Sequence, residues 1–195
     1  MDKSILDMIM GQLDGDKLGK LATQAGINEV QTQEGLRAII PVLLSAMAHN
    51  ADESQGAQSM NAALERDHDG SILDRLDEYL GNPAAGEGDA ILGHVLGDRR
   101  SKVEQRLASR TSLDQGALGK LLALAAPLVM GALGHKQKQE GGLNPDMLGD
   151  WLGQQREASE SAGGIFGFAE DLLDTDRDGD IMDDLGGVAG NLFGR

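Results

Sequence analysis

The sequence predicts an all-α protein in which one helical unit is duplicated and an acidic segment follows. Apolar residues recur at helical spacing, the chain matches itself at an offset of 86 residues, and residues 139–195 hold 13 acidic against 3 basic residues. We therefore expect a duplicated helical domain over 1–140, with copies at about 1–86 and 87–140. A linker with a short helix should cover 141–164, and an acidic helix–loop–helix appendage should cover 165–195.

The duplication is visible without any gap. Shifting the chain by 86 residues places a glycine, a proline, a histidine and several apolar residues opposite residues of the same type. Examples are Gly11 with Gly97, Leu36 with Leu122, Pro41 with Pro127, and His49 with His135. Chance does not readily keep a proline and a histidine in one register. Two equivalent apolar helices should then pack against each other about a pseudo-two-fold axis.

The first helices of the first copy follow from two apolar stripes and their boundary residues. The stripes are Ile5, Met8, Ile9 and Leu13, then Leu18, Leu21, Ala22 and Ala25. Gly26 suits the left-handed position that ends a helix. Asn28, with Gln31 three residues later, predicts a capping box that opens the next helix.

The strongest helical segments cover about 36–47 and, in the second copy, 118–133. Pro41 and Pro127 lie inside them, so a kink is expected at each proline. Two more helices, at about 55–66 and 71–80, complete the first copy, and residues 82–88 link the copies. Tyr79 is the only aromatic residue among the first 150, so Leu, Ile, Met and Ala must fill the core.

Composition narrows the function classes. The formal charge of −15 disfavours binding to nucleic acid through its phosphates, and the absence of cysteine excludes disulfides and thiolate metal sites. No apolar run reaches the roughly 18–20 residues of a membrane span, and no export signal is visible. The expectation is a cytoplasmic protein without a membrane span, although export by a non-classical route would suit a calcium loop better.

Residues 174–184 carry the most specific chemical signal of the chain. Acidic residues alternate there and a glycine follows, as in the first part of an EF-hand calcium loop. A hard cation prefers six to eight oxygen ligands, and the glycine permits the sharp turn that directs alternate side chains to one centre. Positions 1, 3 and 5 are Asp174, Asp176 and Asp178, Gly179 is position 6, and the carbonyl of Asp180 is at position 7.

The end of this loop departs from the EF-hand pattern. Position 12, normally a bidentate glutamate, is Leu185, and the nearest acidic residues are Asp183 and Asp184. Either one of these two closes the site or the site is open and weak. The alternative interpretation is an acidic, solvated turn between two helices. The predicted metal ligands are Asp174, Asp176, Asp178, Asp180, Asp183 and Asp184, and the predicted ion is Ca²⁺.

Three other features carry weaker predictions. Residues 64–76 align with 173–185, but Glu65 stands at position 1, so Asp69 and Ser71 are better explained as caps of the helix at 71–80. His49 and His135 are more simply helix-end histidines than a metal pair. The basic run is better explained as a solvated helix face, which could pair with the acidic tail, than as a nucleic-acid patch; it comprises Arg99, Arg100, Lys102, Arg106 and Arg110.

The second copy resembles a known family. Residues 86–97 (GEGDAILGHVLG), followed by a polar helix and then residues 121–131 (LLALAAPLVMG), are similar to the bacterial YidB-like family of unknown function. The similarity covers about residues 1–140 and implies a compact all-α domain without an established activity. The acidic motif after residue 173 resembles the Asp-x-Asp-x-Asp-Gly-x-Ile tails that follow such domains.

No motif of a catalytic site is present. The chain has no phosphate-binding glycine loop, no GxSxG and no HExxH. The sequence thus favours a non-enzymatic binding or scaffold protein whose C-terminal loop binds calcium, with a protein partner or self-association and no nucleic acid. The alternative is a metal-free structural or protein-interaction module in the cytoplasm.

Overall fold

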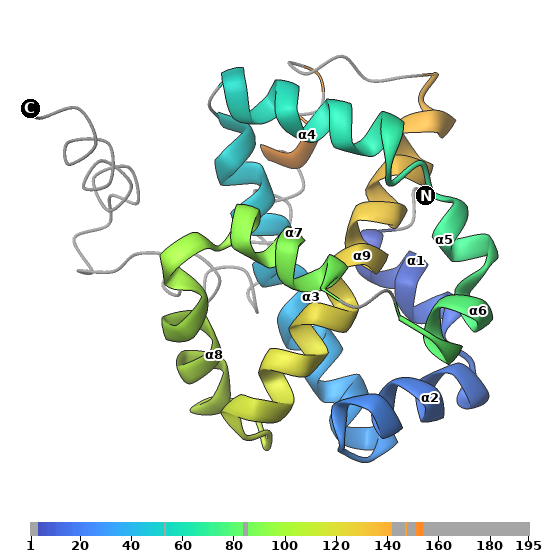
Figure 1. The fold of residues 1–195 in the computed structure, drawn as a ribbon, viewed down its shortest axis with the longest axis vertical. Helices are drawn as coiled ribbons and strands as arrows, with labels where there is room; N and C mark the ends of the chain where they lie inside the picture. Colours follow the sequence, from blue (N-terminus) through green and yellow to red (C-terminus); the bar gives the residue numbers. More distant parts are fainter. Residues whose placement is uncertain (1–3, 53, 84–85, 142–146, 148–150, 154–195) are drawn as a thin grey trace, which may run out of the picture.

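The structure, a computed structural model, describes residues 4–52, 54–83, 86–141, 147 and 151–153, and every regular element in this part is helical (Figure 1). The predicted all-α class is confirmed there. The elements are α1 (Ile5–Gln12), α2 (Gly15–Ala25), α3 (Glu29–Asp52), α4 (Ser54–Arg66), α5 (Ser71–Asp74), α6 (Leu76–Gly81), α7 (Glu87–Val95), the 3₁₀ turn η1 (Gly97–Arg99), α8 (Arg100–Ala108) and α9 (Gln115–Gln139).

The helix boundaries in the first half follow from local chemistry. Gly26 ends α2 in the left-handed conformation (φ 78°), and its N–H bonds the carbonyls of Ala22 and Thr23. Asn28 and Gln31 form the predicted capping box. The Gln31 N–H donates to Asn28 Oδ1 (2.9 Å), and the Asn28 N–H donates to Gln31 Oε1 (3.2 Å).

The long helices α3 and α9 form the centre of the body. Both run unbroken through their internal prolines, Pro41 and Pro127, and they pack against each other. Their apolar residues are almost entirely buried: Leu36, Ile39, Ile40 and Leu43 on α3, and Leu118, Leu121, Leu122 and Val129 on α9, are each 0% exposed. The predicted Leu, Ile, Met and Ala core is present around them.

Among the described residues, α9 is the one helix whose length and apolar composition would also suit a membrane span. In the structure, 72% of its most apolar stretch is buried against the other helices. A central helix of a folded domain is buried in the same way.

The predicted helix at 71–80 is wrong in one respect, because it is two helices rather than one. The chain breaks at Arg75 (φ −113°, ψ 31°) between α5 and α6. The break lets the two pieces reach different neighbours, since α5 packs on α9 while α6 packs on α2. Leu73 on α5 and Leu80 on α6 are both buried as a result.

Two glycines allow backbones to approach closely around α9. A Cβ on Gly88 of α7 would lie only 1.8 Å from the carbonyl oxygen of Ala123, and one on Gly134 would lie 1.8 Å from that of His68. Gly88 therefore belongs to α7 and to its contact with α9, rather than to the linker between copies as the sequence suggested.

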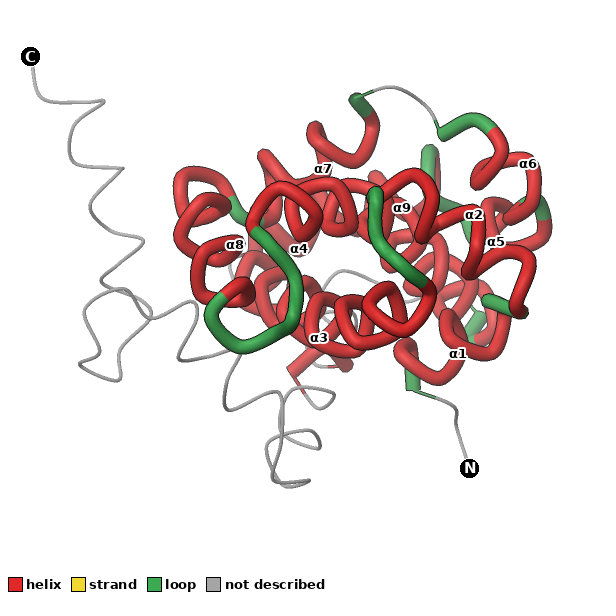
Figure 2. Tube along the Cα trace, turned by 90° about the horizontal axis from the view of Figure 1, so that it is seen from below, coloured by secondary structure: helices red, strands yellow, loops and turns green. Residues whose placement is uncertain are grey.

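The smaller helices surround this centre. The two views place α8 and the α5–α6 pair at opposite ends of the body (Figures 1 and 2). Within the segment that the sequence assigned to a linker, residues 151–153 are helical and Leu152 is 1% exposed as part of the core.

Candidate functional site

The six predicted calcium ligands lie outside the described residues. Asp174, Asp176, Asp178, Asp180, Asp183 and Asp184 all follow residue 153, so the geometry of the acidic loop is not part of the structure described above. The candidate site in the described body is its sequence echo, residues 64–76, where α4 ends and α5 begins.

The echo segment holds its central carboxylate in a structural role. Asp69 Oδ1 accepts the N–H of Ser71 (3.0 Å), and Asp69 Oδ2 accepts a hydrogen bond from Lys138 Nζ on α9 (2.7 Å). The Lys138 ammonium, followed by the Ser71 N–H, holds the pKa of Asp69 far below its ordinary value of 3.8. This carboxylate binds the N–H of the first residue of α5 and ties the turn to α9. Of the two predicted caps, Asp69 thus contributes a hydrogen bond at the helix start, whereas the N-cap position is Gly70 and Ser71 is the first helical residue.

The other acidic side chains of the echo segment are directed elsewhere. Asp67 is paired with Arg66 (2.7 Å), and Glu65 accepts a hydrogen bond from Asn61 on the same helix (3.0 Å). Within the described part of the chain, no three His, Asp or Glu side chains converge as a metal site would require.

The two histidines of the duplication have different surroundings. His49 on α3 is 5% exposed, whereas His135 on α9 is partly exposed and lies 2.9 Å from the side chain of Gln139. The backbone of Gly70 packs directly on His135. A Cβ added to Gly70 would lie only 2.9 Å from the Cα of His135. His135 thus belongs to the contact between α9 and the turn before α5.

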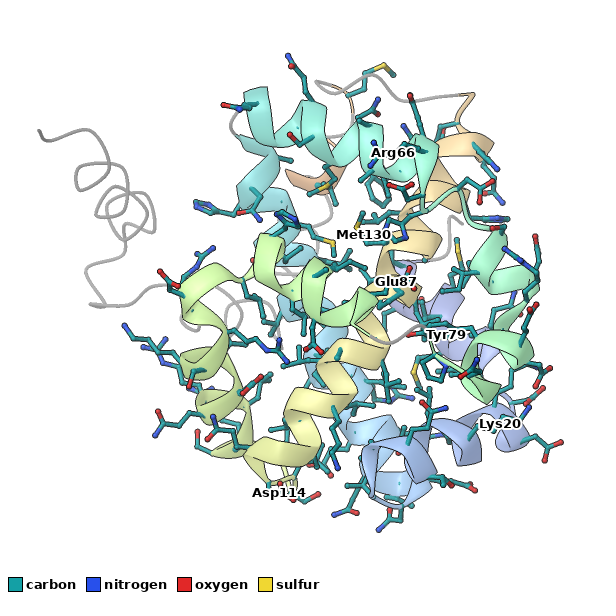
Figure 3. The ribbon with its side chains drawn as sticks, in the orientation of Figure 1. Lys20, Arg66, Tyr79, Glu87, Asp114 and Met130 are labelled. Carbon is teal, nitrogen blue, oxygen red and sulfur yellow. The ribbon has the colours of Figure 1, made fainter. Side chains whose placement is uncertain are left out.

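A hollow of about 240 Å³ opens beside the echo segment. Its wall includes His68, Tyr79 and Glu87, and Figure 3 shows Tyr79 and Glu87 on the same side of the body. His68 Nδ1 lies 3.9 Å from a carboxylate oxygen of Glu87. The Tyr79 hydroxyl donates to the carbonyl of Leu124 (3.0 Å), and burial, with a smaller contribution from Glu87, raises the pKa of Tyr79.

A second, open hollow of about 560 Å³ lies between α7, α8 and α9. Arg100 bridges it, with 2.7 Å to Asp89 on α7 and 2.9 Å to Glu104 on its own helix. The pair with Asp89 fastens α8 to α7, and the pair with Glu104 lies within α8 and holds the Arg100 side chain in place. Lys120 lines the same hollow, is exposed, and makes no ion pair with another described residue.

The basic run lies on and beside α8. Val103 and Leu107 are 0% exposed and hold this helix against α9, while Lys102 and Arg110 are exposed. Of the predicted solvated face, only Lys102 and Arg110 are exposed, because Arg99 and Arg106 are half-buried and Arg100 is turned into the hollow between helices.

A comparison with protein families gives one match. The family model for bacterial proteins of unknown function (DUF937) matches residues 7–136. The chain belongs to this family. The DUF937 match covers most of the body and confirms the family resemblance drawn from residues 86–97 and 121–131. Neither a curated protein nor a solved structure matches the chain.

The DUF937 match ends before the acidic segment begins. Residues 174–184 lie beyond its last residue, 136. The family match therefore describes the helical body, and the only indication of a metal site in the tail is the tail's own sequence.

Proposed function

We propose that this DUF937 protein is a non-enzymatic binding or scaffold protein whose C-terminal loop binds calcium. The observation that carries the proposal is the spacing of Asp174, Asp176 and Asp178 directly before Gly179. Alternating aspartates followed by a glycine supply oxygen ligands on one side of a tight turn, which is the arrangement that Ca²⁺ prefers. The helical body presents the loop, and calcium orders it.

The loop needs one further carboxylate to close. Leu185 stands at position 12, so we assign the closing role to Asp183 or Asp184, with the Asp180 carbonyl as a further ligand. Because an aspartate is shorter than the usual glutamate, the exit from the loop must be tighter than in a standard EF-hand. Fewer oxygen ligands lower the affinity.

The echo segment provides a contrast that supports assigning calcium to the tail alone. Its Asp69 is already bound by Lys138 and by the Ser71 N–H, so a cation would have to displace both partners. Its position 1 is Glu65, which is engaged on α4. The tail loop has only Arg177 as a basic residue between its aspartates.

We also infer that the body is a duplication with a pseudo-two-fold axis. In such an arrangement each contact between the copies recurs with the roles exchanged. Glu34 accepts hydrogen bonds from the N–H (2.9 Å) and the hydroxyl (2.7 Å) of Ser112. The residues 86 positions away are Lys120 and Gly26, and a Cβ on Gly26 would lie 4.0 Å from Lys120 Nζ. This exchange of roles supports the two-fold relation.

A residue on a two-fold axis contacts its own equivalent, and one such pair supports the same inference. Gly35 and Leu121 are 86 residues apart, and Leu121 Cδ2 would lie 2.5 Å from a Cβ on Gly35. The leucine of one copy fills the space that the glycine of the other leaves. The capped starts of the long helices, at Asn28 and Asp114, are also 86 residues apart.

A scaffold role is supported by the way the polar side chains of the body are used. In the hollow beside the echo segment, Tyr79 bonds a backbone carbonyl and Asp69 caps α5. In the hollow between α7, α8 and α9, Arg100 joins Asp89 to Glu104. The Tyr79 contact joins α6 to α9 and the Arg100–Asp89 pair joins α8 to α7, so these side chains hold helices together.

The test is calorimetric titration of the metal-stripped full chain with calcium. We expect saturable binding that Asp176→Ala/Asp178→Ala abolishes. The matched control is Asp67→Ala/Asp74→Ala in the echo segment, which removes the same charge from two exposed positions and should leave binding unchanged. Separate Asp183→Ala and Asp184→Ala variants identify the closing ligand, since the one that closes the loop should weaken binding more.

The measured affinity also indicates where the protein can use calcium. A dissociation constant of about 10⁻⁴–10⁻³ M suits extracellular modules, whereas about 10⁻⁷–10⁻⁵ M suits a cytosolic sensor. A flat titration of the unaltered chain would remove the calcium proposal and leave the metal-free interaction module.

A further inference from the structure

Opposite charges are concentrated in two separate segments of this chain. Residues 99–110, on and around α8, contain five basic residues and one acidic residue. Residues 170–184 contain eight acidic residues and one basic residue. The basic segment has a formal charge of +4, opposite in sign to the net charge of the body. The acidic segment has a formal charge of −7, larger in magnitude than that of any other segment of similar length.

The basic segment is presented on an accessible helix. Val103 and Leu107 are fully buried and hold α8 against α9 at one end of the body, whereas Lys102 and Arg110 are exposed and Arg106 is half-buried (Figures 1 and 2). Lys102 and Arg106 on α8, and Arg110 just after it, follow one another at intervals of four residues, the spacing of neighbours on a helix surface. Lys102 is exposed and makes no ion pair with another described residue.

We propose that the acidic segment 170–184 of the same chain docks on this basic face at α8, defined by Lys102, Arg106 and Arg110. The docking goes beyond the proposed function, because it needs only the charges and holds whether or not the loop binds calcium. The occupant is the chain's own tail, because its charge is complementary and its tether is short.

The tether is long enough for this contact. Sixteen residues separate Gly153 from Glu170. Fully extended, 16 residues span at most about 53–58 Å, while a domain of about 140 residues has a radius of gyration of about 14 Å. Tethering to the body raises the effective concentration of the segment, which for short linkers reaches the millimolar range. Individually weak surface ion pairs can hold a tethered segment under these conditions.

The contact should depend on salt and, if the loop binds calcium, on calcium. At 0.1 M ionic strength the screening length is about 10 Å, and at 1 M it is about 3 Å, so high salt removes most of the attraction between exposed charges. A bound Ca²⁺ would neutralise two charges of the segment and engage the carboxylates that face α8. Only this second dependence rests on the proposed function.

The experiment measures the distance between α8 and the tail in the full-length chain. The protein has no cysteine, so Gln105→Cys on α8 and Ala169→Cys beside the acidic segment accept one spin label each. Gln105 is exposed, and neither position belongs to the basic face or to the predicted ligands. Pulsed electron resonance then reports the distance distribution at low and high salt, without and with calcium.

At low salt we expect a narrow distance distribution that broadens and lengthens by about 10 Å or more in 1 M salt. Lys102→Glu/Arg106→Glu should produce the same change at low salt. The control Lys20→Glu/Arg75→Glu alters the charge equally at the opposite end of the body and should leave the distribution narrow (Figure 3). Circular dichroism verifies that each variant is folded.

A broad distribution in the unaltered protein at low salt would overturn the docking. Equal effects of the α8 variant and the control would also overturn it, because they would show an effect of net charge alone. If adding calcium removes the narrow distribution, the docked segment is released by calcium as well as by salt. A calcium-insensitive distribution that still responds to salt and to the α8 variant keeps the docking, and the calcium loop is then decided by the calorimetric titration alone.

Discussion

The contact of α7 with α9 makes a sharp prediction, because it depends on one missing side chain. A Cβ on Gly88 would lie 1.8 Å from the carbonyl oxygen and 2.6 Å from the carbonyl carbon of Ala123. An ordinary contact requires at least 3.4 Å, so Gly88→Ala must move the two backbones apart by about 1.6 Å. The obstacle is helix backbone, which cannot swing aside as a side chain does.

The energetic cost follows from the separation. Overpacking typically costs about 1–3 kcal/mol, and a radial gap of about 0.5–1 Å already forfeits a quarter to a half of the dispersion energy of neighbouring contacts. Ile91, Leu92 and Val95 of α7 are all buried and would lose contacts together. We expect Gly88→Ala to destabilise the protein by about 3 kcal/mol, which lowers Tm by roughly 6–12 °C for a chain of this size.

The matched control lies on the same helix. Gly93 is exposed in the interior of α7, and a Cβ there would meet nothing within 4 Å. Gly93→Ala should therefore stabilise the protein by about 0.5–1 kcal/mol through helix propensity alone. The assay is urea denaturation followed by far-ultraviolet circular dichroism. The reasoning is refuted if Gly88→Ala is as stable as the unaltered protein, or if both substitutions shift stability in the same direction.

Three further predictions concern single polar side chains. Because the pKa of Asp69 is depressed in the folded protein, its contribution to stability is present above about pH 4 and is lost as the pH falls below that value. The difference in unfolding free energy between the unaltered protein and Asp69→Asn, measured by urea denaturation, should therefore shrink between pH 5 and pH 2. Burial raises the pKa of Tyr79, the only tyrosine, so its absorbance change in the native protein should begin clearly above pH 10, and stability should decline there; a native titration at the ordinary value would contradict the burial. Asp114 Oδ1 caps α9 by accepting the Ala117 N–H (3.0 Å), so Asp114→Ala should cost about 1 kcal/mol in urea denaturation, whereas Gln115→Ala at the next position should cost less.

Local chemistry made much of the first half of the fold predictable. The capping box of Asn28 with Gln31 and the left-handed Gly26 are determined by residues within a few positions of one another, and both are present as predicted. The apolar stripes of α3 and α9 predict their burial, since a helix that is apolar on nearly all sides must lie inside.

The features that the sequence did not predict depend on long-range contacts. The break at Arg75 follows from α5 packing on α9 while α6 packs on α2, and no residue near 75 signals that division. The pairing of Asp69 with Lys138 joins residues far apart in the chain, so only the capping half of the role of Asp69 could be predicted. The sequence predicts that Gly88 belongs to the linker, and only its distance from Ala123 shows that it packs against α9.

The central claim is that this chain binds calcium at one loop, and counting bound ions by native mass spectrometry tests it most directly. We predict one calcium ion per chain in the unaltered protein and in Asp67→Ala/Asp74→Ala, and none in Asp176→Ala/Asp178→Ala. Two ions per chain, one of them lost in the echo-segment variant, would contradict the structural role assigned to Asp69 and its neighbours. No bound ion in the unaltered protein would contradict the calcium proposal itself.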